Sequence, residues 1–382
     1  MNSIEMCNKA NQQNAFEIWD ASHPFPDMQT MQEPARITHI QIEQAKAGGF
    51  HYLHESSCAF HKDQLFVAFA NHPTVERNIE DEVIRGRISK DAGMIFSETQ
   101  MWMAAPQTGG CSFNHPVLST HQDKLWGFFT RWEKDVEKPR TEIFQYSDAS
   151  NQWQPIQKHI PTFVPFHPPM QMKDGNWIMG GESFWFDAAV AISDGNDWSK
   201  WKLAVIPRTD ELKLVYPETA LIDQGDRILA FCRPRQDGLG LVSVSEDCGK
   251  TWTTLAPSNY PMRSSQPCAG LLSTGQHFLI TDYYDVDRHL LMIALTEPGG
   301  KTFKKALKIR HQAYPLRRLF GGYDIGDISN PNTPTKVGTE TEWSYPSAVE
   351  HKGNLYISYT QGKEDCVMSI IPISALTVGG NG

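Results

Sequence analysis

The sequence lacks any long uninterrupted apolar run. Of its 382 residues, 40% are hydrophobic and 21% are charged, and no segment approaches the roughly 18 consecutive apolar residues that a membrane-spanning helix needs. Residues 1–9 also lack the basic and then apolar regions of a secretory signal peptide. We therefore expect a soluble protein with no membrane partner, cytoplasmic as written, or secreted or periplasmic if a signal peptide has been removed.

Paired cysteines are also missing. The seven cysteines are an odd number and form no Cys-x-x-Cys motif. This favours free thiols in a reducing compartment over a disulfide framework or a zinc cluster. We therefore predict no structural metal and no cofactor.

The charge pattern lacks a basic cluster. Lysine and arginine number 35 against 44 aspartates and glutamates, a formal net charge of −9. No block of basic residues is present to neutralise a nucleic-acid backbone, which argues against a nucleic-acid partner. An anionic small substrate remains compatible with this composition, because the local placement of arginines decides such binding. Nothing in the sequence indicates an oligomeric state.

The sequence does contain a repeated polar turn. The clearest copy, residues 245–252, reads Ser-x-Asp-x-Gly-x-Thr-Trp. In such a turn the serine and aspartate side chains can bond the backbone while the glycine takes a positive φ. Looser copies begin at Ser89, Ser147, Ser193 and Thr296. The turns thus recur about every 50 residues, which is the length of one β-propeller blade.

A second series of turns advances with the first. Six times, an apolar run of strand length precedes or follows a polar turn, as at residues 65–69 and 355–359. These turns lie at Asp63, Asp123, Gly175, Gly225, Gly275 and Gly353. We therefore predict an all-β fold, a six-bladed β-propeller of four-stranded antiparallel blades.

The sixth unit ends near Ile373 without a fourth strand. Residues 36–42 can supply it and so close the ring with an N-terminal strand, which removes the exposed edge. We predict an N-terminal arm over residues 1–34 and a single propeller domain over residues 35–378. An insertion at about residues 311–341 interrupts the last repeat, and its aromatic content argues for a functional loop over a disordered one.

The six innermost strands should begin together at one mouth of the channel, because the two series of turns lie on the opposite face. Segments far apart in the sequence would then converge on one pocket. The segments at these positions are polar for strand starts: His54-Glu55, Asn114-His115, Phe166-His167, Tyr216-Pro217-Glu218, Ser265-Gln266 and Ser344-Tyr345. This composition indicates a binding site.

The aromatic and imidazole side chains of this rim have two interpretations. A single histidine at a strand start is more often a solvated or capped side chain than a ligand. Three of them on one rim favour a shared role, either in contacts with sugar hydroxyls or in metal binding. Trp132 and Trp185, in loop positions, are candidates for stacking on a sugar ring.

The polar turn is the Asp-box, and it resembles the turns of sialidase-type β-propellers. Residues 217–233 look like the sialidase segment in which a glutamate opens one strand and an arginine closes the next. Residues 344–357 look like the segment that begins with the nucleophilic tyrosine of that family. By this resemblance Tyr345 is the nucleophile, Glu218 is its base, and the clamp for a substrate carboxylate is Arg233 together with Arg235, Arg317 or Arg318.

The chemistry of these residue types is consistent with that resemblance. A phenol with a pKa near ~10 is a poor nucleophile at neutral pH, and an adjacent carboxylate can take its proton during attack. Arginines bind a carboxylate through two parallel hydrogen bonds. The Arg-Ile-Pro motif of the family is replaced at the first inner strand by His54-Glu55-Ser56-Ser57. The first-blade loop offers Asp81 as the candidate acid, with Glu76, Glu80 and Glu82 as alternatives.

Three functions are compatible with this site. The first is a sialidase-like exo-glycoside hydrolase that removes a terminal, anionic sugar from an oligosaccharide or polysaccharide. The second is a propeller polysaccharide lyase that cleaves uronate-containing glycans by β-elimination, with Tyr216 or His115 as base and Arg233 neutralising charge. The third is a non-catalytic carbohydrate-binding propeller. The other expected substrate contacts are His54, Glu55, His167 and Gln266.

Overall fold

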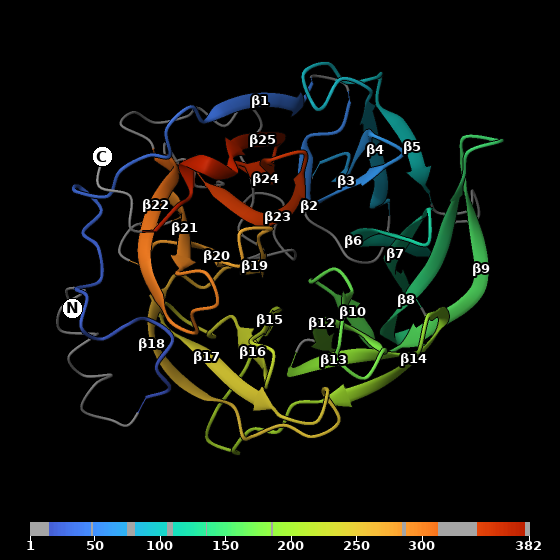
Figure 1. Cartoon of the computed structure of the whole chain (residues 1–382). Coiled ribbons are helices and arrows are strands. Elements are labelled where there is room, and N and C mark those ends of the chain that lie inside the picture. The colour runs from blue at the N-terminus through green and yellow to red at the C-terminus, as the bar shows by residue number, and fades with distance from the viewer. Residues whose placement is uncertain are drawn as a thin grey trace, which may run out of the picture.

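The chain forms a closed ring of six antiparallel sheets around a central axis (Figure 1). The computed structural model describes residues 15–46, 49–74, 81–104, 110–134, 136–184, 186–284, 288–311 and 342–378. Within these ranges the only helical segment is a 3-10 turn, Ile373–Ala375, so no helix there is long and apolar enough to cross a membrane. The predicted all-β, six-bladed propeller is confirmed.

The strands of the first three blades follow chain order from the channel outward. The first blade contains β2 (Tyr52–His61), β3 (Gln64–His72), β4 (Val83–Ser89) and β5 (Gln100–Met103). The second contains β6 (Cys111–His121), β7 (Lys124–Glu133), β8 (Val136–Ser147) and β9 (Gln152–Pro161). The third contains β10 (Phe163–Pro165), β11 (Met170–Gln171), β12 (Trp177–Ser183), β13 (Asp187–Asp194) and β14 (Asp197–Val205).

The remaining blades complete the ring. The fourth contains β15 (Thr219–Asp223), β16 (Ile228–Cys232), β17 (Gly238–Ser245) and β18 (Ala256–Met262). The fifth contains β19 (Cys268–Leu271), β20 (His277–Asp282), β21 (Leu290–Thr296) and β22 (Phe303–His311). The sixth contains β23 (Trp343–His351), β24 (Asn354–Gln361), β25 (Asp365–Pro372) and, as its outer strand, β1 (Thr38–Glu43).

The inner strand of the third blade is broken into β10 and β11, which both pair with β12. Pro165, Pro168 and Pro169 fall at the break, and a proline has no N–H to offer a strand ladder. The break leaves Phe166 and His167 in a loop, where both backbone N–H groups donate to the Gly180 carbonyl, at 3.0 and 3.1 Å. In the third blade, His167 is therefore held by a loop and not by a strand.

The N-terminal strand β1 closes the ring, as the sequence predicts. It pairs antiparallel with β25, with Ile40 opposite Met368, and Ile42 is buried in a core cluster shared by the first and sixth blades. Glu43 at its end accepts a hydrogen bond from Arg87 Nε of β4 at 2.9 Å. Both ends of the chain therefore hold the sixth blade together and link it to the first.

Residues 16–31, within the predicted arm, pack on the outer strands of the fourth and fifth blades (Figure 1). Phe16 bridges to Ser258 of β18, and Trp19 bridges to Phe303 of β22. The Asn259 side chain accepts hydrogen bonds from the N–H groups of Ile18 and Trp19, at 2.8 and 2.9 Å, and donates to the Trp19 carbonyl at 2.7 Å. This segment ties the two blades together at the outside.

Two Asp-box turns make the same set of hydrogen bonds. In the turn that begins at Ser245, the hydroxyl accepts from the Gly249 N–H at 2.8 Å and donates to Asp247 at 2.9 Å, and the Ser89 turn repeats both contacts. Gly249 has φ 74°, and a Cβ there would lie 2.6 Å from Ile178 Cδ1, so only glycine fits. The turn at Ser193 differs, since its hydroxyl donates to the Gly195 carbonyl.

Candidate functional site

Three inner strands each contain a β-bulge of the same kind at the mouth of the channel. In β2, β6 and β23 two residues stand opposite a single residue of the neighbouring strand. The first residue of each bulge has a positive φ: Glu55 at 59°, His115 at 44° and Tyr345 at 56°. A bulge re-aims a side chain, and a positive φ at a bulky residue is strained. Three of the predicted site residues are therefore positioned by the same type of β-bulge.

The hairpin of β15 and β16 sets Glu218 opposite Arg233. Thr219 pairs with Cys232, so the residues just outside that pair face each other, and the Arg233 N–H donates to the Glu218 carbonyl at 3.0 Å. Their side chains meet as well, since Arg233 Nη1 donates to Glu218 Oε1 at 2.7 Å. The local strand pairing alone thus joins this carboxylate and this guanidinium.

Tyr345 reaches the same pair from the sixth blade. Its hydroxyl donates to Glu218 Oε1 and accepts from Arg233 Nη1 at 3.1 Å. Glu218 is 1% exposed and Tyr345 is 7% exposed. Burial raises the pKa of Glu218, and burial together with the charge of Glu218 raises the pKa of Tyr345 well above its usual value. A phenol and a carboxylate therefore share one proton beside a guanidinium.

A second guanidinium, Arg288, lies on the other side of the tyrosine. Its Cζ is 6.0 Å from the Tyr345 ring centroid, and its Nη1 is 2.5 Å from Glu342 Oε1. Ser264 links the two arginines, because its hydroxyl accepts from Arg233 Nε and its carbonyl accepts from Arg288 Nη2, both at 2.9 Å. The site thus contains a fixed pair of guanidinium groups.

Asp282 adds a buried acid behind this pair. It ends β20 and is fully buried. Burial raises the pKa of its carboxyl to about 7, although the charge of Arg288 favours the ionised form. The charge near Arg288 therefore changes within the physiological pH range.

Two histidines of the first two blades also lie at the rim, His54 buried and His115 partly buried. The His54 ring centroid is 4.0 Å from that of Tyr345, and His54 Nδ1 is 2.9 Å from Thr360 Oγ1. His115 Nε2 is 3.1 Å from Glu55 Oε1, and the His115 N–H donates to Glu55 Oε2 at 2.7 Å. Burial lowers the pKa of both rings, that of His115 to about 3, so both are neutral at pH 7.

A pocket opens among the inner strands next to this group. Glu55 and His115 line it together with Phe166 and Gln266. Phe166 packs in one buried cluster with Tyr345 and Trp132, so the pocket borders the tyrosine. Its wall combines a carboxylate, an imidazole, an amide and an aromatic ring, which is a lining suited to a sugar.

The family model of the BNR repeat-like domain matches residues 63–357. This match spans the hairpin turn of the first blade through the middle of the sixth. The chain belongs to the BNR repeat-like family. No curated protein sequence matches it.

Solved structures share the fold of this BNR repeat-like propeller. A protein of unknown function from Dyadobacter fermentans is similar with 16% identity and a TM-score of 0.66, over 89% of this chain and all of the other. The Hadza microbial sialidase Hz136 is similar with 12% identity and a TM-score of 0.65, over 88% of this chain and 69% of the other. A Trypanosoma rangeli sialidase in complex with sialic acid is similar with 11% identity and a TM-score of 0.59, over 91% of this chain and 60% of the other.

The structure does not bring all of the arginines predicted for the carboxylate clamp to Tyr345, although Arg233 contacts its hydroxyl. Arg235 is exposed on the loop after β16, whereas Arg288 lies beside Tyr345. Arg317 and Arg318 fall outside the described residues, as does the predicted insertion around them. The second guanidinium of the described site is therefore Arg288, which sequence reasoning missed because it lies in a turn outside the recognised repeat segments.

The other residues predicted to contact the substrate differ in burial and in their hydrogen-bond partners. Trp132 is buried and its indole N–H donates to Asn114 Oδ1 at 2.8 Å. The ring nitrogens of His167 face the carbonyls of Pro168 and Ala269, at 2.8 and 3.1 Å. Tyr216 is half-buried, with Arg233 Cζ 6.0 Å from its ring centroid. Trp185 is outside the described residues.

The candidate acid Asp81 lies near the start of the third strand of the first blade. Asp81 is exposed, has φ 64° and comes just before β4. Because antiparallel strands alternate in direction, the start of β4 lies at the same end of the blade as the start of β2. Within the described ranges, no three side chains among histidine, cysteine, aspartate and glutamate are placed to hold a metal ion.

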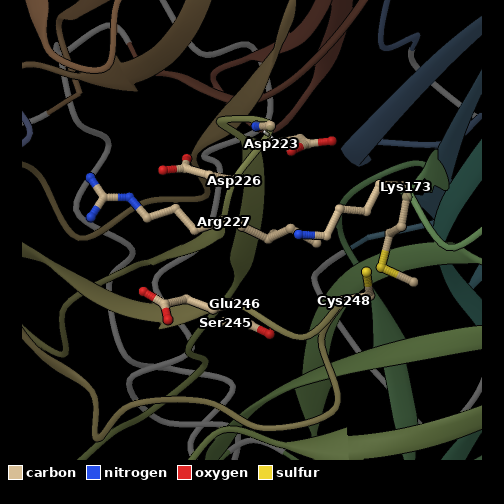
Figure 2. Close-up of a pocket in the computed structure, with 10 residues that line it drawn as sticks. Lys173, Asp223, Asp226, Arg227, Ser245, Glu246 and Cys248 are labelled. Carbon is tan, nitrogen blue, oxygen red and sulfur yellow. Dashed lines mark hydrogen bonds between the residues drawn. The ribbon is translucent and has the colours of Figure 1, made fainter.

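A second pocket lies on the opposite face of the propeller. Figure 2 shows Lys173, Asp223 and Arg227 around it, together with Ser245 of the Asp-box. Its walls are the hairpin turns of the third and fourth blades and the box itself. This pocket lies between turns of neighbouring blades. The inner strands begin at the other end of the channel, where the buried Tyr345 lies.

Proposed function

We propose that this protein is a sialidase-like exo-glycoside hydrolase that removes a terminal anionic sugar from an oligosaccharide or polysaccharide. The observation that supports it is the contact of the Tyr345 hydroxyl with both Glu218 and Arg233. A tyrosine needs a neighbouring base to become a nucleophile, and a carboxylate with a hydrogen bond to the phenol supplies one.

The first step forms a covalent sugar intermediate. The Tyr345 oxygen attacks the anomeric carbon, its proton passes to Glu218 Oε1, and the glycosidic bond breaks. The leaving oxygen takes a proton from an acid, for which Asp81 is the candidate at the rim. Arg233 lies within hydrogen-bond distance of both reacting groups and stabilises the charge that moves between them.

The second step releases the sugar. Water attacks the same carbon, its proton goes to the acid that was deprotonated in the first step, and the tyrosine oxygen regains its proton from Glu218. Two displacements at one carbon retain the configuration of the sugar. The reaction therefore consumes one water molecule and leaves both residues as they began.

Arg233 and Arg288 support an anionic substrate. Two guanidinium groups linked through Ser264 form a ready contact for a carboxylate. A phenol nucleophile suits such a substrate, because an anionic nucleophile would be repelled by the carboxylate near the reacting carbon. The structurally similar T. rangeli sialidase was solved in complex with sialic acid, which is a sugar of this class.

A lyase is the second candidate. Arg233 Cζ lies 6.0 Å from the Tyr216 ring, so a phenol and a guanidinium also meet on the other side of the site. In that reaction a base removes the proton α to a uronate carboxylate and the arginine neutralises the resulting charge. The product would be an unsaturated uronate rather than a hydrated sugar.

One digestion experiment separates these functions. The protein is incubated with a panel of sialylated and uronate-containing oligosaccharides, and products are read by mass and ultraviolet absorbance. We expect release of an acidic monosaccharide, and the summed mass of the products should exceed that of the substrate by one water molecule. Cleavage without a mass gain and with rising absorbance supports the lyase, and binding without any product supports a carbohydrate-binding module.

A further inference from the structure

Two nitrogen atoms at the rim have no hydrogen-bond partner among the residues that the structure describes. They are Nε2 of His54 and Nδ1 of His115, and neither is accessible to solvent. An unpaired polar atom in a protein interior costs free energy. Two such atoms beside a buried tyrosine therefore point to a ligand that completes their hydrogen bonds.

The contacts of His54 favour a proton on Nδ1 over one on Nε2. The Thr360 hydroxyl donates its hydrogen to the Ser344 carbonyl at 3.0 Å. Its oxygen is then an acceptor for His54 Nδ1, 2.9 Å away. Because Nδ1 holds the proton of a neutral imidazole, Nε2 is left with a free electron pair.

The contacts of His115 lead to the opposite tautomer. Its Nε2 lies 3.1 Å from Glu55 Oε1, and a carboxylate oxygen in this position accepts a hydrogen bond from the ring. Nε2 therefore holds the proton and Nδ1 is the nitrogen with the free electron pair. The bulge that carries His115 opens onto the pocket beside Tyr345.

Both rings stay neutral in this setting. Burial disfavours the imidazolium form of His54, as do the positive charges of Lys363, Arg288 and Arg233. Burial has the same effect on His115. The rim therefore combines two guanidinium donors with two neutral imidazole acceptors.

We propose that His54 Nε2 and His115 Nδ1 accept hydroxyl hydrogens of the substrate sugar whose acidic group lies against Arg233 and Arg288. The class of ligand rests on the proposed function. A second acidic group at the histidines would face two electron pairs and the Glu55 carboxylate. The site therefore selects sugars that carry one acidic group and free hydroxyls, and it disfavours sugars with an added sulfate.

Nitrogen NMR of the histidine-labelled full chain tests the tautomers and the contact together. At pH 7 we expect unprotonated Nε2 in His54 and unprotonated Nδ1 in His115. Addition of D-glucuronic acid or N-acetylneuraminic acid should shift these two signals toward hydrogen-bonded values. The His167 signals, whose nitrogens already face carbonyls, serve as the internal control and should not move.

Binding measurements on matched variants extend the test. His54→Phe and His115→Phe keep a ring but lose the acceptor, so each should weaken sugar binding by about tenfold. His54→Gln, which restores an acceptor near the Nε2 position, should recover most of that loss. Glucuronic acid sulfated at one hydroxyl should bind more weakly than glucuronic acid itself.

Several results would overturn the proposal. They are a proton on His54 Nε2, an imidazolium form of either ring at pH 7, a metal ion bound at these nitrogens, or no shift with either acidic sugar. None of these readouts depends on turnover. A protein that binds the sugars through these nitrogens but cleaves no glycoside contradicts the proposed function and leaves this assignment standing.

Discussion

Tyr345 and Glu218 lie in a buried hydrogen bond that favours the carboxylate form of Glu218 and disfavours the ionised form of Tyr345. Burial raises the pKa of the carboxyl, and the carboxylate charge adds to the effect of burial in raising the pKa of the phenol. Arg233 contacts both groups and offsets part of this cost. A single proton can therefore move between the two oxygens without exposing either to water.

The ionisation of Glu218 should set the acidic limit of the proposed reaction. Only the carboxylate can accept the phenol proton, so kcat/KM should fall as the pH drops through a pKa above the usual 4.5. Glu218→Gln should lower kcat by roughly 10²–10⁴-fold. A pH profile of both proteins checks this, with the unfolding midpoint as control. An acidic limb at or below the usual carboxyl pKa is the contrary result.

Asp282 should make stability depend on pH. Its folded pKa of about 7 lies above the usual 3.8, so its contribution is fully present below the unfolded pKa and is lost as the pH rises through 7. Asp282→Asn should therefore gain stability relative to wild type as the pH rises from 4 to 7, by a few kcal/mol (order of magnitude) at pH 8. Urea unfolding across this range measures it. A difference that does not change with pH contradicts the prediction.

Strand bulges and turns decide which side chains reach the site. The sequence allows a prediction of the strand starts, because polar residues there interrupt apolar strands. It does not reveal the bulges or the positive φ of Glu55 and His115, since these depend on pairing with the next strand. A usable signal is present, because proline follows the bulged residue at His115-Pro116 and Tyr345-Pro346.

We expect the Asp-box to affect stability and not catalysis. Ser245 is buried, and its hydroxyl satisfies the Gly249 N–H at 2.8 Å. Ser245→Ala should cost about 1–2 kcal/mol in chemical denaturation while leaving kcat/KM unchanged where the protein is folded. Ser147→Ala, whose hydroxyl accepts from the Ser150 N–H at the longer distance of 3.4 Å, should cost less. A loss of activity at full folding would place the box in the site.

The ring is closed by contacts between the two ends of the chain. Ile42 of β1 lies in the core shared by the first and sixth blades, so its loss should affect the whole propeller. Ile42→Asp buries a charge and should lower the free energy of unfolding by about 3 kcal/mol or more. Exposed Thr38→Asp in the same strand is the control. Fluorescence and circular dichroism should report one shared, shifted transition, and local detachment with an unchanged main transition would contradict this.

Much of the architecture could be predicted because two series of turns advance along the chain together. That regularity indicated the blade number and the closing strand. The break between β10 and β11 is caused by three prolines, which the spacing of the turns does not reveal. Arg288 could not be predicted, because no strand pattern places it, and only the ring brings it beside Tyr345 and Glu342.

Covalent trapping tests the central role of Tyr345 most directly. The protein is incubated with 2,3-difluorosialic acid and with 2-fluoroglucuronosyl fluoride, and the intact mass and peptide map are read. We predict an adduct of the fluorosugar less hydrogen fluoride on the peptide that contains Tyr345, and none with Tyr345→Phe. Turnover of a glycoside by wild type with no adduct, or with an adduct on another residue, would contradict the proposed mechanism.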